Sequence, residues 1–202
     1  DIKTNCINKA EALIRWNHPE KGLVSPDDFI PVAERSGLII TIGEWVINRT
    51  CQISKQLSKL GFDIKISMNL SPSQVADSNL FTYLKDCIQN NQVNPYLLEL
   101  EVTEDVLVDD YSVVETLLSN ARAMGMSVSV DDFGTGYSSL SYLKKLPLDY
   151  LKIDRTFIKE IVQFGSMMIW SHLVTKVWFG STLYAMKNVI QSKFYLSLIT
   201  ED

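Results

Sequence analysis

The sequence predicts an α/β fold with a parallel sheet built from successive βα units. Short apolar runs that suit strands alternate five times with longer segments that suit helices. Polar residues also stand at or near the ends of the strand segments, where loops meet in βα barrels. The 202 residues suffice for one sizeable core, and 46% hydrophobic with 21% charged residues is typical of a soluble globular chain.

The predicted elements follow from local patterns of apolar residues and from helix and turn signals. In chain order they are a strand at 11–16, a turn at 17–22, two short helices at 25–37, a long amphipathic helix at 42–60, a strand at 64–70, a helix at 79–89, a strand at 97–103, a helix at 111–124, a strand at 126–130, a helix at 138–145 and a strand at 150–154.

Several boundaries rest on residues with a clear local role. Ser25 with Pro26 resembles an N-cap followed by proline at the first helical position, and Ser71 to Gln74 resembles a capping box. Pro31 is expected to open a second short helix, because proline is poorly tolerated inside one. Gly61 is expected to stop the long helix.

Two adjacent carboxylates follow the predicted strand at 126–130. Asp131 and Asp132 stand at its carboxyl end, and Gly134 and Gly136 come directly after them. Carboxylates held side by side repel each other unless a cation lies between them, which indicates a divalent metal. A helix N-cap with a turn is the alternative explanation for the same residues.

Polar residues stand at or near successive strand ends, and the two separations near thirty residues each match one βα unit. The polar residues are Glu11, Asn69, Glu101, Asp131 with Asp132, and Lys152. Oxygen donors of this kind suit Mg²⁺ or Mn²⁺ and not zinc. So many carboxylates in one cavity favour two ions, about 3.5–4 Å apart, that would activate water and bind a phosphodiester.

Each residue taken alone has a simpler explanation. Glu11 could be a surface acid, and Asn69 could form the turn before the capping box. Glu99, Glu101 and Glu104 together could be a solvated acidic face. Lys152 could extend from the strand end into solvent. The joint placement at successive strand ends is what favours a site.

Composition excludes some functions. A net charge of −5 disfavours a DNA-binding surface.

The three cysteines, Cys6, Cys51 and Cys87, lie far apart and lack metal-ligand spacing. This indicates buried thiols in a reducing, cytoplasmic setting. No signal peptide is visible, and the apolar stretch at 166–186 contains His172 and other breaks, so we expect no membrane span.

The motifs resemble those of the EAL domain family in their order along the chain. They are Glu11-Ala12-Leu13, Asn69-Leu70-Ser71-Pro72, Glu101-Val102-Thr103-Glu104, Asp131-Asp132-Phe133-Gly134-Thr135-Gly136 and Lys152-Ile153-Asp154. The resemblance implies a TIM-like barrel with two divalent metals that hydrolyses the bacterial messenger cyclic di-GMP to linear pGpG. It extends from about Glu11 to Ile161.

The resemblance also implies roles for individual residues. One metal would be held by Glu11, Asn69, Glu101 and Asp131. Asp131 would bridge to a second metal beside Asp132, and Lys152 would orient or deprotonate the attacking water.

Further roles concern the substrate and a loop. The resemblance implies that Arg15 binds a phosphate of the substrate and that Leu13 and Asp154 also contact the substrate. It implies that Glu104 anchors the loop Phe133–Ser139, which would link metal occupancy to a homodimer. An upstream sensor or GGDEF-type domain is compatible with it.

The two ends of the chain depart from the family pattern. We expect a partial EAL domain at 1–161, with strands two to six of eight, and a divergent tail at 162–202. The tail predicts a helix at 166–178 and a strand at 194–199 but supplies no clear metal ligand in place of the acid from the seventh strand. A module that binds cyclic di-GMP or a partner without hydrolysis, or a fragment without function of its own, are the alternatives.

Overall fold

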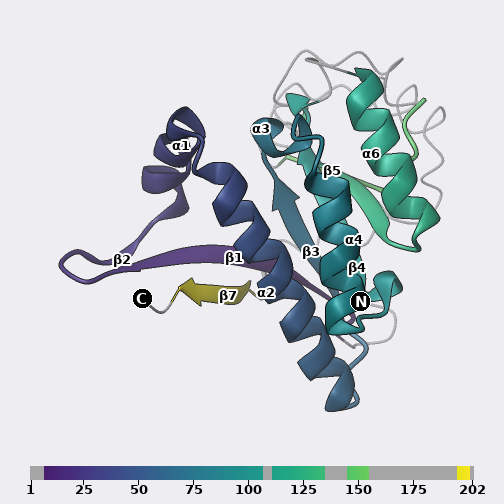
Figure 1. The fold of residues 1–202 in the computed structure, drawn as a ribbon, viewed down its shortest axis with the longest axis horizontal. Helices are drawn as coiled ribbons and strands as arrows, with labels where there is room; N and C mark the ends of the chain where they lie inside the picture. The colour runs from purple at the N-terminus through teal and green to yellow at the C-terminus, as the bar shows by residue number, and fades with distance from the viewer. Residues whose placement is uncertain (1–6, 107–110, 135–144, 155–194, 201–202) are drawn as a thin grey trace, which may run out of the picture.

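The computed structural model describes residues 7–106, 111–134, 145–154 and 195–200. These residues form one sheet of seven strands. Helices pack against this sheet (Figure 1). The predicted α/β class with a parallel sheet is confirmed. Among the helices of these ranges, none is long and apolar enough to cross a membrane.

The elements follow the predicted order with two additions, the strand β2 and a short 3-10 helix. In chain order they are β1 (Lys9–His18), β2 (Gly22–Val24), α1 (Pro26–Ser36), α2 (Ile39–Lys59), β3 (Lys65–Leu70), α3 (Pro72–Val75), α4 (Leu80–Asn91), η1 (Pro95–Leu97), β4 (Leu98–Thr103), α6 (Tyr111–Ala123), β5 (Ser127–Phe133), β6 (Tyr150–Ile153) and β7 (Tyr195–Thr200).

The sheet order is β2-β1-β3-β4-β5-β6, with β7 also paired to β1. Strands β1, β3, β4, β5 and β6 pair in parallel, so their carboxyl ends lie at the same edge of the sheet. Strand β2 forms an antiparallel hairpin with the end of β1. Strand β7 runs parallel to β1, with Glu11 opposite Tyr195 and Trp16 opposite Thr200.

The two faces of the strands differ in polarity because side chains alternate along a strand. One face carries apolar residues such as Met68, Leu100 and Val130, which are fully buried against a core that includes residues of α2, α4 and α6. Figure 1 shows these helices side by side over the sheet. The opposite face carries buried polar residues, among them Glu99 and Ser129.

Pro31 does not open a second helix, so that prediction was wrong. The helix α1 runs unbroken from Pro26 to Ser36 with Pro31 inside it. Proline removes a single backbone hydrogen bond here, to a carbonyl in the first turn, and the buried side chains of Phe29 and Ala33 on either side hold the helix in place.

Other boundaries were predicted correctly. Gly37 follows α1 in the left-handed conformation, and the capping box between Ser71 and Gln74 is present at the start of α3. The strand predicted at 194–199 is β7. The helices predicted at 138–145 and 166–178 lie outside the described residues or almost entirely so.

Gly43 of α2 lies against the capping residue of α3. A methyl group at Gly43 would stand 1.7 Å from Gln74 Nε2 and 2.6 Å from its Cδ. The Gln74 side chain has little freedom to move, because it is buried and its Oε1 accepts the backbone N–H of Ser71. This close approach fixes the start of α3, three residues after Asn69.

We therefore predict that Gly43→Ala destabilises the fold by about 1–3 kcal/mol, the usual range for overpacking. Urea unfolding measures the change. In the double variant with Gln74→Ala, the added methyl group has space, so the two losses will be less than additive. Additive losses, or an unchanged stability in Gly43→Ala, would show that the two helices do not meet in this way.

The buried thiols give a second test of the fold. Cys51 is fully buried, and burial, with a smaller contribution from Cys87, raises its pKa to about 12. Burial also raises the pKa of Cys87. Because the thiolate is the reactive form, both thiols should be unreactive at pH 8. In a Cys6→Ser variant we predict that a disulfide reagent labels these two cysteines only after unfolding; rapid labelling of the native chain would contradict the packing of α2 on α4.

Candidate metal centre

Three carboxylates from three strands meet on the face of the sheet opposite the apolar core of α2, α4 and α6. Glu11 lies on β1, Glu101 on β4 and Asp131 on β5, and one oxygen from each lies within 4.8 Å of the others. Glu101 is fully buried, whereas the side chains of Glu11 and Asp131 are about one-quarter exposed, at 22% and 25%. The cluster thus has a buried base and an opening toward solvent.

Asn69 joins this cluster from the end of β3. Its Nδ2 donates a hydrogen bond of 3.0 Å to Glu11 Oε1, and it stands opposite Glu101 in the pairing of β3 with β4. The strand order therefore brings together residues that are 58 and 32 positions apart in the sequence. Four of the predicted ligands lie at one place, as their positions at strand ends predicted.

Lys152 of β6 supplies the positive charge among these carboxylates. Its Nζ donates hydrogen bonds to Glu101 and to Asp131, the latter at 3.1 Å, and lies 3.9 Å from Glu11 Oε2. Burial alone would lower the pKa of Lys152, but the surrounding carboxylates outweigh burial and raise it. Lys152 is therefore a charged ammonium in this arrangement, and the alternative that it only extends into solvent is wrong.

Burial raises the pKa of Glu101, and the charge and hydrogen bond of Lys152 offset only part of that effect. A carboxylate buried this deeply needs a positive partner to remain ionised. Lys152 supplies one here, at a position that a divalent cation could share or take over.

The donor set fits a divalent cation. Four carboxylates lie on this face of the sheet, those of Glu11, Glu99, Glu101 and Asp131, and the ammonium groups that contact them are those of Lys9 and Lys152. Four carboxylates and two ammonium groups sum to a net charge of −2 for these six groups. Oxygen donors with excess negative charge are the environment that Mg²⁺ and Mn²⁺ prefer.

Asp132 does not lie with the three clustered carboxylates. Strand β5 extends to Phe133, with an irregular register between Val130 and Phe133, and Asp132 has a positive φ of 53°. This irregularity turns Asp132 toward solvent, and its backbone N–H donates to Asp131 Oδ1 at 2.9 Å. The predicted strand end at Val130 was therefore too early, and the two aspartates differ in their environment.

Glu104 is buried just beyond β4 and contacts the start of the glycine loop. Its Oε2 accepts the backbone N–H of Gly134 at 2.8 Å. The backbone N–H of Asp154 donates to the carbonyl of Phe133 nearby, which ties the end of β6 to the end of β5. The predicted loop Phe133–Ser139 lies outside the described residues after Gly134.

The predicted substrate residues Leu13 and Arg15 lie on β1, two and four positions beyond Glu11. Both are partly buried, and Arg15 Nη1 donates to the carbonyl of Ile14 at 2.7 Å. Leu13 and Arg15 face the same side of the strand as Glu11, by the period of two. The structure does not bring Arg15 into the carboxylate cluster itself.

The sequence interpretation missed an ion pair that lies next to the cluster, toward the amino-terminal ends of the strands. Lys9 of β1 donates to Glu99 Oε1 at 2.6 Å, and the hydroxyl of Ser129 donates to the same oxygen at 2.7 Å. Glu99, Glu101 and Glu104 are all buried, so the alternative of a solvated acidic face is wrong. The signal was the spacing of two between Glu99 and Glu101 on a strand, which puts both on one face.

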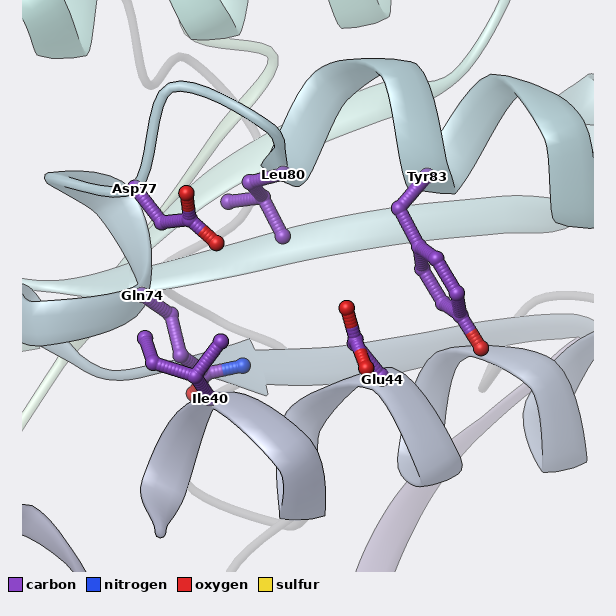
Figure 2. A pocket seen from close by; sticks show the side chains of 6 residues that line it. All are labelled: Ile40, Glu44, Gln74, Asp77, Leu80 and Tyr83. Atoms are coloured by element: carbon purple, nitrogen blue, oxygen red, sulfur yellow. The ribbon is translucent and has the colours of Figure 1, made fainter. Parts of the chain in front are cut away.

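A separate small pocket lies among the helices, away from the cluster of Glu11, Glu101 and Asp131. Figure 2 shows the Glu44 side chain in it, between α2 and the Tyr83 ring of α4. Its lining residues are Ile40, Glu44, Gln74, Asp77, Leu80 and Tyr83, and none of them is a predicted site residue.

Comparison with known proteins shows that this chain is similar to bacterial signalling proteins. The curated protein MucR of Pseudomonas aeruginosa, named a bifunctional diguanylate cyclase/cyclic di-GMP phosphodiesterase, is 45% identical over 152 residues, which is 75% of this chain and 22% of MucR. The signaling protein YkoW of Bacillus subtilis is 42% identical over 160 residues, or 79% of this chain and 20% of YkoW. This chain therefore spans about a fifth of the length of these relatives.

Solved structures agree with this relationship. The MucR phosphodiesterase in complex with c-di-GMP has a TM-score of 0.69 at 44% identity, over 73% of this chain and 60% of that chain. The cGMP-bound EAL enzyme Bd1971 has a TM-score of 0.70 at 33% identity, over 98% of this chain and 52% of that one. A family model described as the EAL domain matches residues 1–176. The chain therefore belongs to the EAL domain family, whose fold is a TIM-like barrel.

Proposed function

We propose that this chain is the phosphodiesterase part of a bacterial signalling protein and hydrolyses cyclic di-GMP to linear pGpG. The observation that carries the proposal is the convergence of Glu11, Glu101 and Asp131 around the Lys152 ammonium. The names of relatives support it, since MucR and other matching proteins are called cyclic di-GMP phosphodiesterases.

Glu11, Asn69, Glu101 and Asp131 would hold Mg²⁺ or Mn²⁺, and Asp132 would contribute to a second ion beside Asp131. Such ions neutralise phosphate charge and lower the pKa of bound water. Asp132 is exposed and lies outside the group of Glu11, Glu101 and Asp131, so the second ion would lie toward solvent from the first.

The other residues would bind the substrate and orient the attack. Lys152 has three donors and no acceptor as an ammonium, so it would hold a water molecule by donating to its oxygen. A role as general base needs a strongly lowered pKa, which the surrounding carboxylates oppose. Arg15 would bind a phosphate through its planar guanidinium, with Leu13 and Asp154 as further contacts.

Regulation would act through the loop that Glu104 holds. The hydrogen bond from Gly134 to Glu104 supports an anchoring role, and the loop Phe133–Ser139 would contribute to a homodimer. An upstream sensor or GGDEF-type domain fits the greater length of the relatives, and the name of MucR includes diguanylate cyclase. We expect the protein to act in the cytoplasm.

Removal of a ligand tests the metal centre. We predict that Glu11→Gln lowers hydrolysis of cyclic di-GMP in Mg²⁺ or Mn²⁺ by more than the roughly 10–100-fold that outer-shell substitutions cost. Chromatography of pGpG measures the rate, and Asp28→Asn, an exposed acid on α1, is the control that should keep full activity. Equal rates in Glu11→Gln and the original chain would refute the site.

Lys152→Met separates binding from turnover. Without the ammonium, the carboxylates keep their affinity for Mn²⁺ or bind it more tightly, because a competing cation is gone. Hydrolysis should fall roughly 100-fold or more, because the attacking water loses the group that positions it. Calorimetric titration with Mn²⁺ and the pGpG assay measure the two effects. If the original chain binds cyclic di-GMP tightly but releases no pGpG, the alternative of a non-hydrolytic binding module is correct.

A further inference from the structure

A second layer of charges lies next to the carboxylate cluster, toward the amino-terminal ends of the parallel strands. Lys9 precedes Glu11 by two residues on β1, and Glu99 precedes Glu101 by two on β4, so all four face the same side of the sheet. Lys9 Nζ lies 2.6 Å from Glu99 Oε1 and 3.6 Å from Glu101 Oε1. The Lys9 ammonium therefore stands between two buried carboxylates and is nearer to Glu99.

Glu99 is held firmly in this position. It is fully buried, and its Oε1 accepts hydrogen bonds from Lys9 and from the hydroxyl of Ser129, itself fully buried. The Lys9 side chain is 34% exposed and its Nζ lies 5.3 Å from the centre of the Tyr150 ring. Glu99 is thus the fixed partner, and Lys9 is the partner with freedom to move.

We propose that Glu99 is a positioning residue that holds the Lys9 ammonium away from Glu101 and so keeps Glu101 available as a metal ligand. This inference rests on the proposed function of the cluster as a metal centre. Glu101 has an ammonium on each side, with Lys152 bonded to its Oε2 and Lys9 approaching its Oε1.

The physical reason is competition for one charge. A cation that pairs closely with Glu101 reduces the attraction of that carboxylate for any other cation. Lys152 is also in contact with Asp131 and has an alternative partner when a metal binds. Lys9 has Glu99 as its alternative partner. Removing the charge of Glu99 would leave Glu101 as the carboxylate within reach of Lys9 among the described residues.

The test uses Glu99→Gln in the full 202-residue chain. Glutamine has nearly the same shape and keeps an acceptor for Ser129, but it lacks the charge that retains Lys9. We expect the affinity for Mn²⁺, measured by calorimetric titration, to fall roughly 10–100-fold, as for other outer-shell substitutions in metal sites. In the double variant Lys9→Met with Glu99→Gln, the Lys9 ammonium that would compete for Glu101 is gone, and the affinity should return at least to its original value.

The double variant distinguishes positioning from a merely structural role. If the two residues only stabilise the fold, removing both will leave Mn²⁺ binding as weak as in Glu99→Gln, and that result would overturn the inference. Unchanged affinity in Glu99→Gln would also overturn it. Thermal unfolding of each variant shows whether it is folded. Should Glu99→Gln not fold, Ser129→Ala loosens the same carboxylate and should lower affinity in the same direction, and an unchanged affinity there counts against the inference.

Glu11→Gln distinguishes failure of the metal centre from failure of the positioning role of Glu99. If the original chain binds no Mn²⁺, or binds it equally well after Glu11→Gln, the metal centre itself is wrong. If binding requires Glu11 but does not respond to Glu99 and Lys9 as described, the metal centre stands and only the positioning role fails.

Discussion

The attraction between the Lys152 ammonium and three carboxylates is the interaction on which the site depends. Glu11, Glu101 and Asp131 come from different strands, and their oxygens lie within 4.8 Å of one another. At an effective dielectric constant near 20, two unit charges 4 Å apart interact by about 4 kcal/mol, so such a group is unstable without a cation. The cluster is therefore built to hold positive charge, first from Lys152 and, under the proposed function, from a divalent metal that shares the same oxygens.

The period of two along each strand makes this arrangement compatible with a stable core. On β4, Leu100 and Val102 are buried in the core while Glu101 between them points to the opposite face. Each strand that carries a predicted ligand thus has its position set by apolar packing on its other side. Stability and chemistry are divided between the two faces of one sheet, and a change in the core on β4 would shift Glu101 as well.

Much of this could be predicted from the sequence, for identifiable reasons. Parallel strands bring their carboxyl ends to one edge, so the placement of Asn69, Glu101 and Asp131 followed from their positions at strand ends. The turn of Asp132 toward solvent could not be predicted, since it depends on the irregular pairing of β5 with β6. The pair of Lys9 and Glu99 was missed because residues 90 positions apart meet through the strand order. The pairing of β7 with β1 is equally non-local.

A crystal structure of the chain soaked with Mn²⁺, with the ion located by its anomalous scattering, tests the central claim most directly. We expect a peak bounded by oxygens of Glu11, Glu101 and Asp131, with the Lys152 ammonium moved from its contact with Glu101. An empty cluster at saturating Mn²⁺, with Lys152 still bonded to Glu101, would show that these carboxylates pair with lysine alone and do not form a metal centre.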